Sequence, residues 1–199
     1  MLCLLCVGLL SCDEVVSEER AAEIRIDTAS VPTDAAAVDA IDAAAAEIAP
    51  PDVEATATPG PAIGIRTGYT NPVKLISFAK TLKGIPYKYA STDPKVGFDC
   101  SGFITYVFNH FGITVPRTSV DFTNEGEPVQ LGSSKPGDLI LFTGTDSTQR
   151  WVGHMGIITQ TGDSIVFIHS TSGKAYGVTE TTLNPYYMGR FMKVIRVFK

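Results

Sequence analysis

The order of apolar and polar residues predicts a helix in the middle of the chain. It begins at Asn71-Pro72, because proline fits the first helical turn, and it ends at Gly84. The stripe that we expect to face the core consists of Val73, Ile76, Phe78, Ala79 and Leu82. The residues from Ile85 to Phe98 are rich in Gly, Pro, Ser and Asp, and they predict a loop.

A second helix is predicted directly after this loop. Asp99 is a favourable N-cap residue, and Gly112 is a favourable stop. The positions between them repeat at helical spacing and place one apolar stripe on a single face, formed by Phe103, Val107, Phe108 and Phe111.

Beyond Pro136-Gly137 the apolar pattern changes to short runs rich in Ile, Val and Phe, which indicate strands. The expected strands are Asp138-Phe142, His154-Thr159, Ser164-His169 and Lys193-Phe198. Helices followed by strands favour an α+β fold, with an antiparallel sheet packed against N-terminal helices.

Charge divides the chain into two parts. Residues 13–62 carry a net charge of −10 and residues 63–199 a net charge of +5. The first part is rich in Ala, Asp, Glu, Thr and Pro and has no aromatic side chain, so it cannot offset the entropy cost of folding. We predict a disordered acidic linker over residues 12–65 and a folded domain over residues 66–199. The sequence contains no cluster of Arg and Lys with interleaved aromatic residues, so we do not expect nucleic acid as a partner.

The first residues form an apolar run, Met1 to Leu10, that is too short to span a bilayer. The run suits a secretory signal, and Leu9-Leu10-Ser11-Cys12 resembles a bacterial lipobox. This resemblance predicts a signal peptide at residues 1–11, a lipid on Cys12, and a membrane-anchored location in the cell envelope. One departure is that no Lys or Arg precedes the run.

Cys100 is the one cysteine outside the first twelve residues. It follows the predicted N-cap Asp99, where unpaired amide groups and the helix dipole favour an anion. We therefore expect a lowered thiol pKa and a nucleophilic thiolate. A buried structural cysteine is the alternative.

Two histidines are candidates for the base that a nucleophilic cysteine needs. His154 begins one predicted strand and His169 ends the next. If these strands pair through the turn Thr161-Gly162-Asp163, the two rings meet at one end of the sheet. His154 would then accept the thiol proton and His169 would orient it. His110 lies too far along the helix of Cys100 to take part.

Six short segments of the sequence resemble, in the same order along the chain, segments of the NlpC-type (new lipoprotein C) cysteine peptidases of bacterial cell walls. The nucleophile segment of that family is matched by Phe98-Asp99-Cys100-Ser101-Gly102-Phe103. Five other segments match in register, namely Gly84-Ile85-Pro86-Tyr87, Pro116-Arg117-Thr118-Ser119, Pro136-Gly137-Asp138-Leu139, Gly153-His154-Met155-Gly156-Ile157 and Phe167-Ile168-His169-Ser170-Thr171. The resemblance covers residues 70–198 and implies a papain-like fold.

The resemblance also implies roles for individual residues. Cys100 would attack the scissile carbonyl, His154 would be the general base and then the general acid, and His169 would orient it. Tyr87 would help to stabilise the oxyanion. Asp99 and Ser101 would line the cleft and, in family members whose substrate has a free N-terminal amine, help to bind that amine. Ala90-Ser91 stand where many members have a Gly-Gly pair.

The implied reaction is hydrolysis of the γ-D-glutamyl–diamino acid bond in stem peptides or muropeptides of peptidoglycan. Two alternatives remain open at this point: an N-acetylmuramoyl-L-alanine amidase of the CHAP type, and a non-catalytic wall-binding lipoprotein. We expect no cofactor and no metal site, since a thiol hydrolase needs neither, and we expect a monomer.

Overall fold

The structure is a computed structural model that describes residues 58–199. The expected signal peptide, the lipidation site Cys12 and most of the expected linker lie outside the described residues. The residues just before the expected domain start at residue 66 contact the domain. The amides of Ile63, Gly64 and Ile65 donate to the carboxylate of Glu125, which is buried. These hydrogen bonds join the end of the expected linker to the folded domain.

The first described helix, α2 (Pro72–Thr81), begins as expected, with the side chain of Asn71 accepting a hydrogen bond from the amide of Val73. It ends before Gly84, because Leu82 already forms its C-cap. The assignment of Val73 to the buried stripe was wrong, since 64% of this residue is exposed. Successive residues turn by about 100°, which puts Val73 away from the face that is buried in the core, formed by Leu75, Ile76, Ala79 and Leu82.

The second helix, α3 (Cys100–His110), has Asp99 as its N-cap, as expected. Behind it lies a six-stranded sheet with the order β3-β8-β4-β5-β6-β7, in which all neighbours are antiparallel. The strands are β3 (Glu127–Val129), β4 (Leu139–Thr143), β5 (Val152–Gln160), β6 (Val166–Thr171), β7 (Gly177–Thr182) and β8 (Phe191–Arg196). The predicted α+β class with an antiparallel sheet is confirmed.

Several elements were not predicted from the apolar pattern. The expected loop before α3 contains a small hairpin, and two 3-10 turns and a short helix occur elsewhere. These elements are β1 (Thr92–Asp93), β2 (Gly97–Phe98), η2 (Val120–Asn124), η3 (Leu131–Ser133) and α4 (Pro185–Arg190). The edge strands β3 and β7 were also missed. β3 has only three residues, and β7 consists mainly of Gly, Thr and Glu; pairing with β8 and β6 holds them in the sheet.

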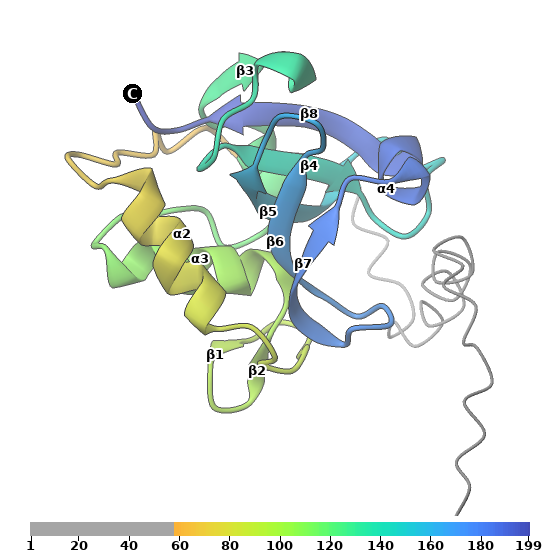
Figure 1. Ribbon diagram of the computed structural model, residues 1–199, viewed down its shortest axis with the longest axis horizontal. Helices are drawn as coiled ribbons and strands as arrows, with labels where there is room; N and C mark the ends of the chain where they lie inside the picture. The colour runs from red at the N-terminus through yellow and green to blue at the C-terminus, as the bar shows by residue number, and fades with distance from the viewer. Residues whose placement is uncertain (1–57) are drawn as a thin grey trace, which may run out of the picture. The chain divides into compact units, whose positions relative to one another are not determined.

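The sheet has a core on each face, because alternate residues of a strand point to opposite sides. In β4, Leu139 and Leu141 join the core that contains α2 and α3, whereas Ile140 and Phe142 join a smaller core that includes Tyr187 of α4. Figure 1 shows α2 and α3 together on one side of the strands and α4 at the other end of the molecule. The short helix α4 thus packs on the face of the sheet opposite to the face that α2 and α3 cover.

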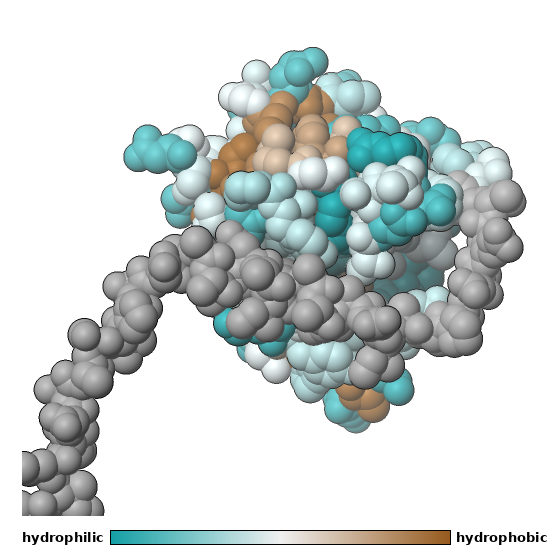
Figure 2. Space-filling view, turned by 90° about the vertical axis from the view of Figure 1, so that its right-hand side faces the viewer, coloured by the Kyte–Doolittle hydropathy of each residue, from teal (hydrophilic) through white to brown (hydrophobic). Residues whose placement is uncertain are grey.

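The surface seen in Figure 2 is mainly hydrophilic, with a hydrophobic area near its upper edge and a smaller one near its lower edge. Such a pattern is ordinary for a protein surface in contact with water. Within residues 58–199, no helix has the length and apolar character that crossing a membrane requires.

Candidate active site

Cys100 occupies the first position of α3, and the residues around it fix the start of the helix. The side chain of Asp99 accepts a hydrogen bond from the amide of Gly102 at 2.5 Å. Ser101 Oγ also donates to this carboxylate, at 3.3 Å. The side chain of Asp99 therefore caps the helix. The amide of Cys100, in the first turn, has no hydrogen-bond acceptor within the helix.

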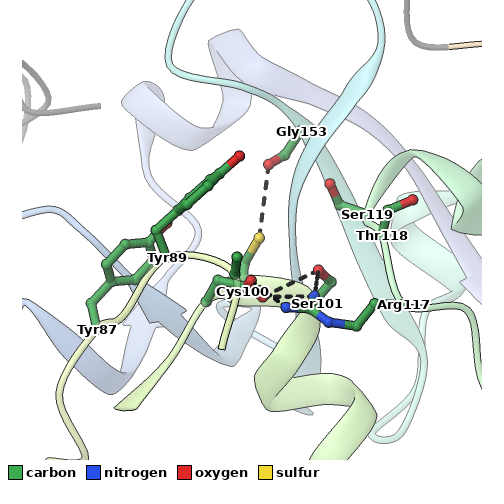
Figure 3. A pocket seen from close by; sticks show the side chains of 10 residues that line it. Tyr87, Tyr89, Cys100, Ser101, Arg117, Thr118, Ser119 and Gly153 are labelled. Carbon is green, nitrogen blue, oxygen red and sulfur yellow. Dashed lines mark hydrogen bonds and ion pairs between the residues drawn. The ribbon is translucent and has the colours of Figure 1, made fainter. Parts of the chain in front are cut away.

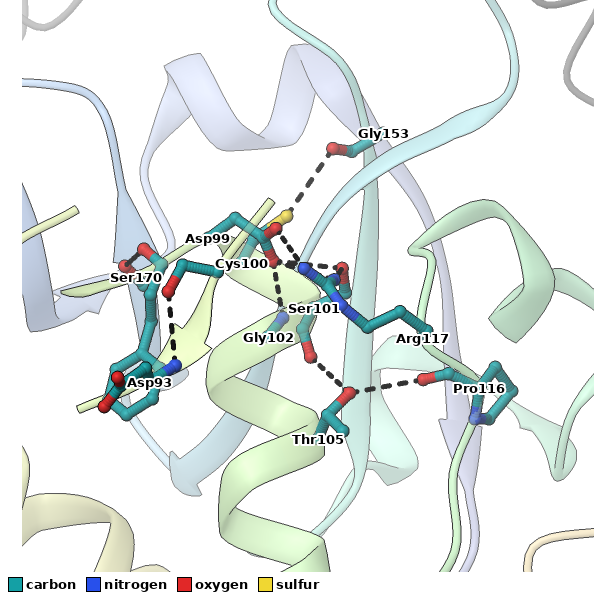
Figure 4. Close-up of polar contacts among 12 residues, drawn as sticks. Asp93, Asp99, Cys100, Ser101, Gly102, Thr105, Pro116, Arg117, Gly153 and Ser170 are labelled. Carbon is teal, nitrogen blue, oxygen red and sulfur yellow. Dashed lines mark hydrogen bonds and ion pairs between the residues drawn. The ribbon is translucent and has the colours of Figure 1, made fainter. Parts of the chain in front are cut away.

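Arg117 holds the same carboxylate from the segment that follows α3 (Figure 4). Its two terminal nitrogens lie 3.2 Å from Asp99 Oδ1 and 2.7 Å from Asp99 Oδ2, and one of them also donates to Ser101 Oγ at 3.1 Å. Both oxygens of Asp99 are thus engaged. Each carboxylate oxygen can accept a further hydrogen bond, and the expected role of Asp99 in binding a free amine stays a prediction.

Gly102 allows the preceding loop to pack on the helix start. A β-carbon at this position would overlap the carbonyl oxygen of Ser91 and approach Asp99 Oδ1. The same carbonyl accepts the amide of Asp99 at 3.2 Å. A glycine is therefore required for the loop and the helix to meet.

A cavity of about 490 Å³ opens beside Cys100 (Figure 3). The structure brings together Tyr87, Asp99, Cys100 and Ser101 in its wall, as expected from the sequence. The rest of its lining is Tyr89, Ala90, Arg117, Thr118, Ser119 and Gly153. Ala90 has a positive φ of 57°, which is uncommon for a residue other than glycine.

Cys100 reaches strand β5 directly before the first candidate base. Its Sγ donates to the carbonyl oxygen of Gly153 at 3.8 Å, and Gly153 precedes His154 (Figure 3). Gly153 lies at a bulge of the β4–β5 pair, where Phe142 is opposite His154 and Thr143 is opposite Val152. The bulge brings the backbone of β5 to the start of α3.

The two histidines lie together as expected. β5 and β6 pair antiparallel, and His154 Nε2 is 2.8 Å from His169 Nδ1. Tyr187 of α4 packs against both rings, with centroid distances of 6.2 Å to His154 and 5.6 Å to His169. His110 is exposed at the far end of α3 and stacks on Phe78, away from this pair.

Both histidines favour the neutral ring. Burial, followed by the nearby His169 and the Arg190 guanidinium, lowers the pKa of His154 well below its usual value. Burial and Arg190 lower the pKa of His169 to about 3. A neutral His154 can accept a proton, which is what a general base requires.

The expected lowering of the thiol pKa was wrong in direction. Burial, together with the charge of Asp99, raises the pKa of Cys100 to about 12. The backbone amides of Ser101 and Cys100 and the charge of Arg117 do act to lower it, but they are outweighed. At neutral pH the resting site therefore holds a thiol and a neutral imidazole, and the thiol has to be deprotonated as it reacts.

Tyr87 enters the cavity from the strand-like segment before β1. Its amide donates to the carbonyl oxygen of Tyr176, and it forms a parallel bridge with Phe98. Burial, followed by the charges of Cys100 and Asp99, raises the pKa of its phenol above the usual value. The hydroxyl therefore stays protonated and can donate a hydrogen bond.

Four residues beside the expected site residues were not singled out from the sequence. One of them is Thr181, whose hydroxyl oxygen lies 2.8 Å from His169 Nε2. Arg117 lies in one of the segments that resemble the family, and this position could have marked it as a candidate site residue. Arg190 and Tyr187 lie on a short helix without a clear apolar period, and Thr181 lies on an unpredicted strand. Arg190 is buried and donates to the carbonyl oxygens of Thr143 and Gly144.

A family model described as "NlpC/P60 family" matches residues 84–196. The chain belongs to the NlpC/P60 family. Members of known structure include an NlpC/P60 family protein from Bacillus cereus, which is 31% identical, with a TM-score of 0.58 over 66% of this chain and 41% of that one. The NlpC/p60 domain of the peptidoglycan hydrolase SagA shares the fold, with a TM-score of 0.52 at 22% identity, over 64% of this chain and 99% of that one. The predicted papain-like fold of the NlpC/P60 type is confirmed.

Relatives in sequence include a gamma-DL-glutamyl hydrolase of Bacillus subtilis, 34% identical over 128 residues, which are 64% of this chain and 30% of that protein. The murein DD-endopeptidase MepS/murein LD-carboxypeptidase of Escherichia coli is 32% identical over 117 residues, 58% of this chain and 57% of that protein. The chain thus spans about a third of the first relative and somewhat more than half of the second.

Proposed function

We propose that this NlpC/P60 chain is a cysteine peptidase that hydrolyses stem peptides of cell wall peptidoglycan, with Cys100, His154 and His169 as its catalytic residues. The observation that carries the proposal is the placement of Cys100 at an open helix start, against the strand that bears the His154–His169 pair. Membership in a family whose relatives include a murein endopeptidase and a probable peptidoglycan endopeptidase supports the substrate class.

The reaction would proceed through a thioester. The proton of Cys100 Sγ passes to His154 as the sulfur bonds to the scissile carbonyl carbon, so a free thiolate need not accumulate. The negative charge that develops on the carbonyl oxygen is stabilised by the amide of Cys100 and the hydroxyl of Tyr87. His154 then gives its proton to the leaving amine, and water hydrolyses the thioester with His154 again as the base.

For the bond, we propose the γ-D-glutamyl–diamino acid linkage. Support comes from the similarity to the Bacillus subtilis gamma-DL-glutamyl hydrolase. We further propose that Cys12 carries a lipid that anchors the chain in the cell envelope.

The test is digestion of purified peptidoglycan, followed by mass spectrometry of the released fragments. We expect stems cut after D-glutamate, and a fall of at least about 10³-fold in rate for Cys100→Ala and His154→Gln. His110→Gln is the matched control and keeps wild-type activity, since His110 is exposed and remote from the site.

Other outcomes would point to other functions. Release of whole stems from the glycan would identify an amidase of the CHAP type. Binding to the wall without hydrolysis by the wild-type chain would identify a non-catalytic wall protein. Full activity of Cys100→Ala would exclude the proposed mechanism.

A further inference from the structure

His169 has a hydrogen-bond partner on each side of its ring. Its Nδ1 lies 2.8 Å from His154 Nε2, and its Nε2 lies 2.8 Å from the hydroxyl oxygen of Thr181 in β7. The register of β6 and β7 sets the second contact. His169 is opposite Thr179, and Thr181 is the diagonal neighbour two residues along, on the same face of the sheet.

We propose that Thr181 is a positioning residue, whose hydroxyl accepts the Nε2 proton of His169 and thereby holds His154 in the tautomer that can act as a base toward Cys100. The inference rests on the proposed function and adds a fourth residue to the three catalytic ones. Thr181 touches neither the substrate nor the thiol in this scheme, and it acts through the two rings.

The proton positions follow from the contacts. To accept the thiol proton at Nδ1, His154 must carry its own hydrogen on Nε2, and this hydrogen then points at His169 Nδ1. His169 must therefore be bare at Nδ1 and protonated at Nε2, where the neighbouring atom is Thr181 Oγ1. In the opposite arrangement His154 would be protonated at Nδ1, and its ring could not accept the proton.

The surroundings of His169 make the hydroxyl hard to replace. The ring is fully buried, and it packs against Phe167 at 4.8 Å and Tyr187 at 5.6 Å between centroids. An Nε2–H group that lost its acceptor here would have no solvent beside it, and an unsatisfied buried donor is costly. With the Thr181 hydroxyl as acceptor, His169 is protonated at Nε2 and, through the contact of the two rings, so is His154; with the hydroxyl as donor, both rings would be protonated at Nδ1.

The test compares Thr181→Val, which keeps the shape but removes the hydroxyl, with Thr181→Ser, which keeps the hydroxyl. Thr179→Val is the matched control, because Thr179 lies on the same strand directly opposite His169 and its hydroxyl contacts the carbonyl oxygen of Glu180 instead. The chain has three histidines, so ¹⁵N-histidine NMR spectra of the full-length protein can resolve every ring.

We expect both His154 and His169 to be protonated at Nε2 in the wild type, in Thr181→Ser and in Thr179→Val. In Thr181→Val we expect a mixture of tautomers at both rings and a kcat about tenfold lower, with KM unchanged, since tenfold in rate corresponds to about 1.4 kcal/mol. Serine at position 181 should restore kcat.

Two results would overturn the proposal: a wild-type His154 protonated at Nδ1, or spectra and kcat of Thr181→Val that match those of Thr179→Val. The spectra need no substrate. If the wild-type chain failed to cut peptidoglycan, the proposed function would fall, whereas the spectra would still decide whether Thr181 sets the tautomers.

Discussion

Arg117 binds both carboxylate oxygens of Asp99, the residue that caps the helix of Cys100. The two side chains come from positions 18 residues apart in the sequence. The contact joins one wall of the cavity to the start of α3. Because Asp99 is both a cap and half of an ion pair, its two contributions to stability can be separated by substitution.

We predict that Asp99→Ala lowers the free energy of unfolding by about 2 kcal/mol, through loss of the cap and of the partner of Arg117. Asp99→Asn keeps a capping side chain and should cost about half as much. Urea denaturation of the two variants measures the difference. Equal losses would show that the cap contributes nothing beyond the ion pair.

The raised pKa of Cys100 predicts slow alkylation at neutral pH. The rate with iodoacetamide at pH 7 should be lower than that of an unperturbed cysteine, whose pKa is about 8.5, and it should keep rising with pH through 9. Mass spectrometry of the peptide that contains Cys100 follows the reaction, and the same chain in urea is the control. Fast, pH-independent alkylation between pH 6 and 8 would instead indicate a thiolate that the helix start has stabilised.

The lowered pKa of His154 predicts that activity persists in weak acid. Protonation removes the base, and the pKa lies well below 6.5, so the ring stays neutral as the pH falls from 7 to 5.5. We therefore expect kcat/KM on a soluble stem peptide to change less than twofold over this range. A decline centred near pH 6.5 would contradict the neutral histidine pair.

Substitution of Gly102 should damage the site. In Gly102→Ala, the new methyl group meets the carbonyl oxygen of Ser91, so the loop has to move away from the helix start. We expect a loss of about 2 kcal/mol in the free energy of unfolding and a fall in kcat/KM of at least tenfold. Gly189→Ala is the control, since Gly189 also lies in a helix and its β-carbon would enter open space. Equal stability of the two variants would show that the loop adapts.

The lowered pKa of Glu180 predicts that the folded protein loses stability in acid. Burial acts to raise its pKa, but hydrogen bonds from Lys80, Lys83 and Thr159 outweigh it and lower the pKa to about 2. Since the folded pKa lies below the unfolded one, this contribution is present above pH 4.5 and is lost as the pH falls toward 2.

The measurement is thermal unfolding as a function of pH. Glu180→Gln should cost about 1 kcal/mol at pH 7 and nothing near pH 2. A constant difference across this range would show that the side chain acts through packing and not through its charge.

The sequence predicted much of the fold because local rules decide much of it. Asn71 and Asp99 are favourable caps wherever they precede a helix, and both do cap α2 and α3. The strands β4, β5, β6 and β8 follow from runs of Ile, Val and Phe. The edge strands β3 and β7 and the helix α4 did not follow, since none of them has a strong period of its own and all are held by neighbours.

The sequence by itself determined which chemistry is present: one thiol at a helix start, two histidines on consecutive strands, and a tyrosine before them. Only the tertiary structure decided the state of these groups. Burial raises the pKa of Cys100 and outweighs the opposite effect of the helix start. Arg117 forms an ion pair with Asp99, and the hydroxyl of Thr181 contacts Nε2 of His169. Solvation and hydrogen-bond partners depend on residues that are distant in the chain, and only the packing of the sheet and helices brings them together.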